Sequence, residues 1–161
     1  MSLIKTLLKE SILNNRDKNL LQNSTWKDFD IDMETDHEFL DSEVIFKKRL
    51  TFDLAEYFTV DVVYESNSPD IVRIDGMWLD DELRGLGIGY KVFEAIAVKF
   101  GAIYDSKSNM SKDGKQLFEK ISKDDNFEVI GLDSEIYAHV LVLHKSNPNN
   151  QKAKKWFDGY S

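Results

Sequence analysis

The residues with the clearest chemical use lie near the middle of the chain, where an apolar run passes into a glycine-rich stretch. Arg84 is followed by three glycines that alternate with two aliphatic residues, namely Gly85, Leu86, Gly87, Ile88 and Gly89. Glycines at the start of a helix leave backbone N–H groups able to point at an anion, and the helix dipole favours phosphate there. The guanidinium of Arg84 adds a permanent positive charge. The stretch therefore predicts a phosphate-binding loop.

Two common nucleotide-binding loops do not match this stretch. A Walker A loop ends in Gly-Lys-Ser/Thr, whereas Tyr90 follows Gly89. A dinucleotide fingerprint requires G-x-G-x-x-G, and here the third glycine comes one residue too early. A plain strand-to-helix turn also accounts for three glycines, so the glycines alone leave that alternative open.

The order of the residues resembles the acetyl-CoA motif of the GNAT superfamily of N-acetyltransferases, R/Q-x-x-G-x-G/A. Arg84, Gly87 and Gly89 occupy the defining positions, and the run from Glu82 to Gly89 is similar to the family's E-x-R-G-x-G-I-G version. The resemblance implies that backbone amides of the loop hold the pyrophosphate and that the end of the preceding strand binds the pantetheine arm. The implied cofactor-binding set is Trp78, Leu79, Arg84, Gly85, Leu86, Gly87, Ile88, Gly89, Tyr90, Ser111 and Phe118.

The resemblance continues downstream, where the family has a fifth strand splayed from the fourth and then a helix. Residues 111–121 are similar to the family's N-x-x-A-x-x-L-Y-x-K-L pattern, with Ser111 for Asn and Phe118 for Tyr. In many members that Tyr protonates the departing CoA thiolate, and Phe118 has no hydroxyl. Tyr90, Tyr104 or a water molecule replaces it, or the chain binds acetyl-CoA without efficient turnover.

The family often uses a carboxylate on its fourth strand to take a proton from the attacking amine. Asp75 is the candidate catalytic residue, because strand alternation places Arg73, Asp75, Met77 and Leu79 on one face. An ordinary ion pair between Asp75 and Arg73 is the alternative.

The elements that must position these residues can be predicted from hydrophobic periodicity. Apolar residues at helical spacing indicate an N-terminal amphipathic helix: Leu3, Ile4, Leu7, Leu8 and Ile12. Strands are expected at 29–33, 44–52, 57–65, 71–79, 102–105, 127–130 and 135–144, and helices at 84–100 and 111–123. The expected fold is therefore α+β, a GNAT-like, mostly antiparallel twisted sheet flanked by helices, with an extra N-terminal helix.

We divide the chain into three parts. Residues 1–25 are an N-terminal helix and turn packed on the domain, 26–145 the acetyltransferase-like domain, and 146–161 a C-terminal tail with one helical turn of tucked aromatics. The family normally inserts a helical pair between its first two strands, and the link from Asp36 to Ser42 leaves little room for one. Leu8-Lys9-Glu10 resembles an L-x-E processing site, so the first helix is either an ordinary packing element or an address.

Composition restricts the partners. The formal net charge of −8 disfavours nucleic acid and anionic membranes, which require a surplus of Lys and Arg. The chain has no cysteine, and its three histidines, His37, His139 and His144, are too scattered for a metal site. We expect a cytoplasmic protein without a resident metal. The sequence leaves open whether the protein forms a homodimer.

Two functions follow from these residues and the resemblance. The first is an acetyl-CoA-dependent N-acetyltransferase whose acceptor is a small-molecule amine or the amino group of a peptide or protein. The second is a GNAT-like binding or regulatory module that keeps the acetyl-CoA loop with weak or no catalysis.

Overall fold

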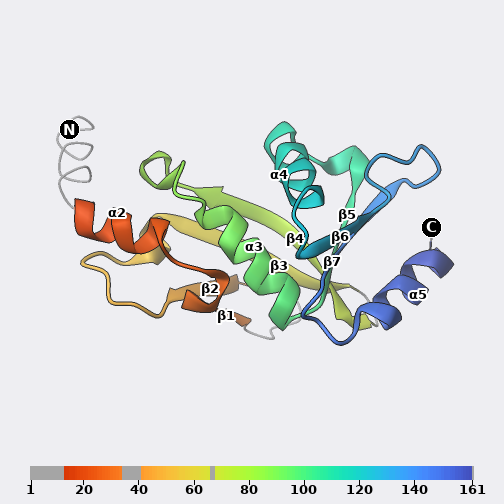
Figure 1. Cartoon of the computed structure of the whole chain (residues 1–161), viewed down its shortest axis with the longest axis horizontal. Helices are drawn as coiled ribbons and strands as arrows, with labels where there is room; N and C mark the ends of the chain where they lie inside the picture. The colour runs from red at the N-terminus through yellow and green to blue at the C-terminus, as the bar shows by residue number, and fades with distance from the viewer. Residues whose placement is uncertain (1–12, 34–40, 66–67, 161) are drawn as a thin grey trace. The chain divides into compact units, whose positions relative to one another are not determined.

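A computed structural model describes residues 13–33, 41–65 and 68–160, and within them the fold is mixed α+β (Figure 1). Its strands are β1 Phe29–Met33, β2 Asp41–Phe46, β3 Phe58–Glu65, β4 Ser68–Leu79, β5 Ala102–Ser106, β6 Phe127–Ile130 and β7 His139–His144. Its α-helices are α2 Asn15–Gln22, α3 Ile88–Lys99, α4 Lys112–Ser122 and α5 Asn150–Tyr160. The predicted fold class is confirmed. The helix predicted at residues 3–12 lies outside the described residues.

The seven strands follow the order β1-β2-β3-β4-β5-β7-β6. The pairs β1–β2, β2–β3, β5–β7 and β6–β7 are antiparallel, whereas β4–β5 is parallel. The chain divides into two compact units. We call residues 1–61 with 76–95 the first unit and residues 62–75 with 96–161 the second unit.

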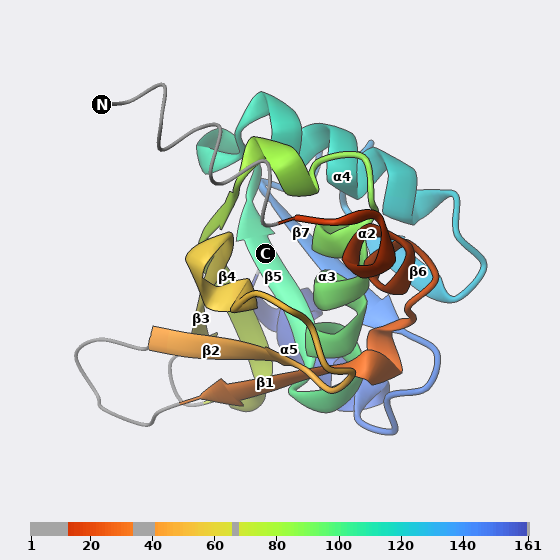
Figure 2. The same ribbon diagram turned by 90° about the vertical axis from the view of Figure 1, so that its left-hand side faces the viewer.

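The first unit buries one face of its strands. Along β1 and β2, Phe29, Ile31 and Val44 are almost fully buried, while their neighbours Asp32 and Glu43 are exposed. This alternation is the pattern of an antiparallel sheet with one dry and one wet face. Figure 2 shows α2 beside the first turns of α3.

The predicted bounds of two elements in the first unit are wrong. The strand expected at 44–52 ends at Phe46, because the following residues leave the sheet to meet α2. The buried carboxylate of Asp17 accepts the N–H of Thr51 at 3.3 Å and also binds its hydroxyl. The helix expected from Arg84 begins only at Ile88, after a short 3-10 helix η3 (Asp81–Leu83).

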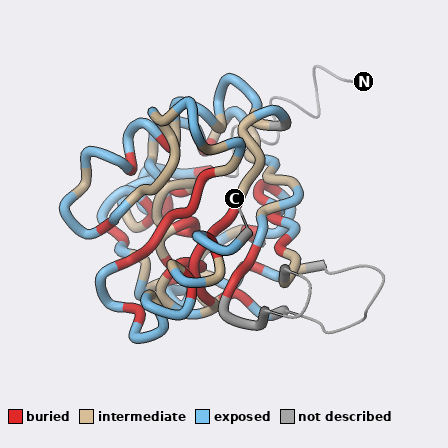
Figure 3. The backbone as a smooth tube through the Cα atoms, turned by 90° about the vertical axis from the view of Figure 1, so that its right-hand side faces the viewer, coloured by how far each residue is buried: buried red, intermediate tan, exposed pale blue. Residues whose placement is uncertain are grey.

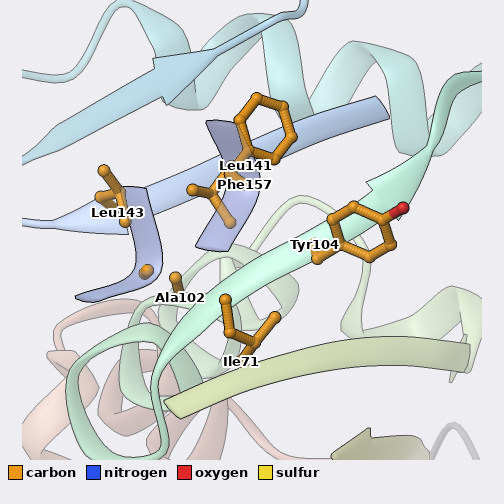
Figure 4. Packing of buried hydrophobic residues seen from close by; sticks show 7 residues of the cluster. Ile71, Ala102, Tyr104, Leu141, Leu143 and Phe157 are labelled. Carbon is orange, nitrogen blue, oxygen red and sulfur yellow. The ribbon is translucent and has the colours of Figure 1, made fainter. Parts of the chain in front are cut away.

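The second unit has an aromatic core around β5, β7 and α5 (Figure 4). The cluster consists of Ile71, Ala102, Tyr104, Leu141, Leu143, Ala153 and Phe157. Tyr104 has Trp156 edge-on at 5.1 Å between ring centroids. Helix α5 contributes Ala153 and Phe157 to this core. It spans residues 150–160 and is longer than the single helical turn predicted for this segment. Figure 3 shows how buried stretches of the backbone give way to exposed outer turns.

Strands β4 and β5 pair side by side and then part. Their register pairs Ile71 with Ala102 and Val72 with Ile103, and the described residues that follow on the two strands have no further register pair. Figure 4 shows the two ribbons diverging from Ile71 and Ala102 toward Tyr104. The sequence predicted this splay through the family resemblance.

The last strand is shorter than predicted. Strand β7 begins at His139 instead of residue 135, because residues 131–138 form a link whose backbone is tied to the end of β5. The N–H of Lys107 donates to the carbonyl of Ala138 at 3.1 Å, and the Lys107 ammonium donates to the carbonyl of Ser134 at 2.6 Å.

Candidate functional site

The loop predicted to bind phosphate follows β4 in the first unit. The carboxylate of Asp80 accepts the N–H of Glu82 at 3.1 Å and so caps η3. Leu83 is fully buried and anchors the turn. Arg84 then leaves the short helix with an extended backbone, φ −67° and ψ 144°. The start of the loop is thus held firmly by the chain itself.

The next residues require glycine. Gly85 and Gly87 have φ of 83° and 73°, which is a left-handed conformation that costs an L-residue with a Cβ about 1–2 kcal/mol. The first helical bond of α3 runs from the N–H of Lys91 to the carbonyl of Gly87 at 3.2 Å. The N–H groups of Ile88 and Gly89 therefore have no acceptor inside the helix. Gly87 has no side chain with which to cap them.

The three glycines differ in what surrounds them. A Cβ on Gly85 would meet nothing within 4 Å, and one on Gly87 would meet only the end of the Lys91 side chain at 3.8 Å. A Cβ on Gly89 would instead sit 3.6 Å from the sulfur of Met77 on β4. Gly85 and Gly87 therefore border open space, whereas Gly89 lets α3 pack close to β4.

Charges beside the loop are of both signs. The Nε of Arg84 lies 3.0 Å from a carboxylate oxygen of Asp81, and both side chains are largely exposed. An exposed pair of this kind is worth about 0–1 kcal/mol, so an incoming anion can compete for the guanidinium. Glu82, in the same turn, is half-buried.

Lys91 joins the first turn of α3 to the end of α2, and sequence reasoning missed it. Its ammonium donates to the carbonyls of Leu21 and Gln22, each at 2.8 Å, and to the hydroxyl of Ser24 at 3.3 Å. Burial lowers the pKa of Lys91, and the charge of Asp28 offsets part of that effect. No local spacing in the sequence signals a partner some seventy residues away.

The end of β4 presents two further predicted residues, Trp78 and Leu79. Trp78 is unusually exposed for its type, at 51%. Leu79 is half-buried, and the next N–H, that of Asp80, donates to the carbonyl of Tyr57 at 2.7 Å. Tyr90 is half-buried in the first turn of α3. The residues from Trp78 to Tyr90 thus form one continuous strand end, turn, loop and helix start.

Three predicted residues belong to the second unit. Asp75 is mostly exposed and lies 3.8 Å from the guanidinium of Arg73, which is the ion pair foreseen as the alternative to catalysis. Ser111 caps α4, because its hydroxyl accepts the N–H of Gly114 at 3.0 Å. Phe118 is 4% exposed within α4. Their proposed roles toward acetyl-CoA stay predictions.

A second carboxylate of this unit was missed from the sequence. Asp105 lies on β5 just beyond the point where β4 and β5 part, and it accepts the N–H of Ser106 at 2.8 Å. Burial raises the pKa of Asp105, while the Ser106 N–H and the charges of Arg73 and His139 lower it in part. A carboxylate after an apolar strand was visible in the sequence, but its burial was not.

The described residues contain no group of three or more His, Asp or Glu side chains arranged to hold a metal ion. In the same ranges, no helix has both the length and the apolarity needed to cross a bilayer. No protein-family model, curated protein or solved structure matches the chain.

Proposed function

We propose that the chain binds acetyl-CoA through residues 84–89 and transfers the acetyl group to a primary amine, as a member of the GNAT superfamily. One observation carries the proposal: two left-handed glycines, Gly85 and Gly87, border open space directly before a helix whose first N–H groups have no acceptor within it. A pyrophosphate fits such a loop, because backbone N–H groups and the helix dipole both favour an anion there.

The parting of β4 and β5 supports the same function. Strands that separate after Val72 and Ile103 leave the backbone groups beyond those residues unpaired with each other. The end of β4, from Gly76 to Leu79, belongs to the same unit as the loop, and an extended amide-containing arm such as pantetheine is the class of ligand that can use its backbone groups.

Transfer requires a group that accepts the proton of the attacking amine. The amine nitrogen forms a bond to the acetyl carbonyl carbon, the carbon–sulfur bond breaks, the thiolate leaves with the bonding electrons, and the amide and CoA thiol remain after proton transfer. Asp75 is one candidate base. Asp105 is a second candidate, because burial raises its pKa and so brings this carboxylate closer to neutral pH, where a general base works best.

Efficient transfer also requires a group that protonates the departing thiolate, whereas a module that only binds acetyl-CoA does not need one. Phe118 supplies no hydroxyl, and Tyr104 is buried among aromatic rings, stacked on His139 at 4.9 Å. Tyr90 is the more accessible of the two tyrosines. The missing hydroxyl favours, as a second candidate, a module that binds acetyl-CoA with weak or no turnover.

A matched pair of substitutions tests the loop. Gly85→Asn and Gly85→Asp both enter open space, both side chains tolerate the left-handed region, and they differ by one charge. We expect acetyl-CoA to raise the melting temperature of the parent and of Gly85→Asn. At a hundredfold excess over Kd, binding adds about 2.7 kcal/mol to the free energy of unfolding. Gly85→Asp should bind at least about tenfold more weakly, from roughly 1.4 kcal/mol of repulsion.

The controls separate binding from catalysis. NAD and ATP test whether the loop prefers CoA over other nucleotides. Release of CoA thiol with a panel of amines separates a transferase from a binding module. Equal acetyl-CoA affinity in the Asp and Asn variants would contradict the proposed pyrophosphate site.

A further inference from the structure

The solvent-exposed sheet face of the first unit differs from that of an ordinary antiparallel sheet, because it combines exposed apolar side chains with several carboxylates. We call it the open face, and it comprises Asp30, Asp32, Glu43, Ile45, Thr59, Asp61, Gly76 and Trp78. Register joins its members across β1 and β2, with Asp30 opposite Ile45 and Asp32 opposite Glu43. The carboxylate of Asp61 lies 3.5 Å from where a Cβ on Gly76 would be, so the face continues onto β4.

Helix α3 packs on the other side of β4. Gly89 of α3 faces the sulfur of Met77, and side chains alternate along a strand, so Gly76 and Trp78 point away from the helix. Two of the three exposed large apolar residues among the described residues lie on the open face, Ile45 at 45% and Trp78 at 51%. The face therefore combines exposed apolar surface with charge.

The charge on the open face is almost entirely negative, and its arrangement destabilises the sheet. Asp32 stands directly opposite Glu43 in the β1–β2 register. Like charges directly opposite each other destabilise a sheet. Within the described ranges, Lys47 bridges Asp30 at 3.3 Å, and no cation lies within ion-pair distance of Asp32, Glu43 or Asp61.

We propose that the open face docks a cationic polypeptide segment. Lysine or arginine charges on that segment would relieve the repulsion between the facing carboxylates, and their aliphatic stems would cover Ile45. A guanidinium or ammonium over Trp78 adds a cation–π contact. A small polyamine supplies the charges but covers little of the apolar surface, so the exposed tryptophan favours a polypeptide.

Trp78 also belongs to the implied cofactor-binding set, but the docking proposal does not rest on acetyl transfer, and its test contains no acetyl-CoA. The probe is a fluorescein-labelled peptide of Lys, Arg and Gly, followed by anisotropy at low and physiological salt with the full chain. We expect binding that weakens as salt is added, because exposed charges are screened. Spermine and an acidic peptide of equal length are the comparison ligands.

A matched pair of triple variants locates the binding. Asp32→Asn/Glu43→Gln/Asp61→Asn changes the open face, and Glu119→Gln/Asp125→Asn/Glu135→Gln removes the same charge from exposed positions of the second unit. We expect about tenfold weaker binding for the first triple and less than about twofold for the second. Trp78→Ala should weaken binding about two- to fivefold.

Folding is checked by circular dichroism, and the open-face triple should melt no lower than the parent, because it removes facing like charges. Equal weakening by both triples would assign the binding to net charge alone and overturn the proposal. Failure of the peptide to bind at low salt would also overturn it, as would spermine binding equally tightly with no effect of Trp78→Ala.

Discussion

The loop before α3 and the link between β6 and β7 both use left-handed glycine, and they use it for different reasons. In the β6–β7 link, Gly131 has φ 91°, and a Cβ there would lie 2.5 Å from the carbonyl oxygen of His139 and 3.2 Å from Tyr137. In the loop before α3, Gly85 has a similar φ of 83° but open space around it. The link needs glycine because the chain itself crowds the position. Crowding does not explain the loop.

The comparison shows which glycines internal packing explains. At Gly131 both the dihedral angle and the neighbouring atoms demand the smallest residue, so the fold accounts for it completely. At Gly85 and Gly87 the dihedral angle demands glycine, while the space beside it is left open. A loop that keeps its backbone bare next to open space is suited to close approach by a ligand.

The largest expected effect is at the crowded glycine. Gly131→Ala should lower the free energy of unfolding by about 3 kcal/mol, from about 1–2 for the left-handed conformation and about 1–3 for overpacking against backbone. Urea denaturation followed by circular dichroism measures it. A loss below about 1 kcal/mol would mean that the link moves readily, and the contrast between the two turns would disappear.

A smaller loss is expected in the loop. Gly87→Ala should cost only the conformational part, about 1–2 kcal/mol, because its Cβ would meet just the flexible end of Lys91. Gly89→Ala is the matched control, since no left-handed angle applies there, and the result should lie between no change and a gain of about 1 kcal/mol. If both variants lose equal stability in urea, backbone conformation is not what distinguishes the two glycines.

The smallest expected effect on stability comes from the carboxylate charge of Asp105. His139, whose carbonyl faces Gly131, begins β7, and its charge acts on Asp105. Because burial raises the pKa of Asp105 in the folded state, the folded chain holds that proton more strongly than the unfolded chain does. Stability therefore falls as pH rises from the ordinary pKa through the raised one, and the loss persists above it.

Asp105→Asn removes that penalty. We expect the variant to be more stable than the parent at neutral pH by under about 1 kcal/mol, since the carboxylate is partly solvent-screened. The advantage should vanish at pH values below the ordinary pKa of Asp, where the parent is itself neutral. Melting curves across pH measure this difference, and a constant gap at all pH values would show that burial of the charge is not its cause.

Much of the element order was predictable because it depends on local periodicity. The run at 127–130 became β6 with the predicted bounds, and the alternating stretch around Phe29, Ile31 and Met33 became β1. Predictions failed where a distant residue decides the backbone. Asp17 draws Thr51 out of the expected strand, and Lys107 holds the carbonyls of Ser134 and Ala138 outside β7.

The candidate site divides in the same way. Arg84 and the glycines were recognisable from residue type and spacing, and so was the strand-to-helix setting of the loop. The start of α3 was placed too early, because helical spacing of apolar residues does not reveal positive φ angles at Gly85 and Gly87. Asp105 was overlooked because a pKa raised by burial depends on atoms from several strands.

The sequence by itself determined the fold class, the succession of the seven strands with the two helices α3 and α4, and the position of the glycine loop, because these follow from patterns within a few residues. Helix α2 was not predicted. Tertiary structure decided which glycines border open space, that Asp105 is partly buried, and that Asp32 of β1 faces Glu43 of β2. Those properties depend on register and packing between segments that are distant in sequence, and the local spacing of residues predicts neither.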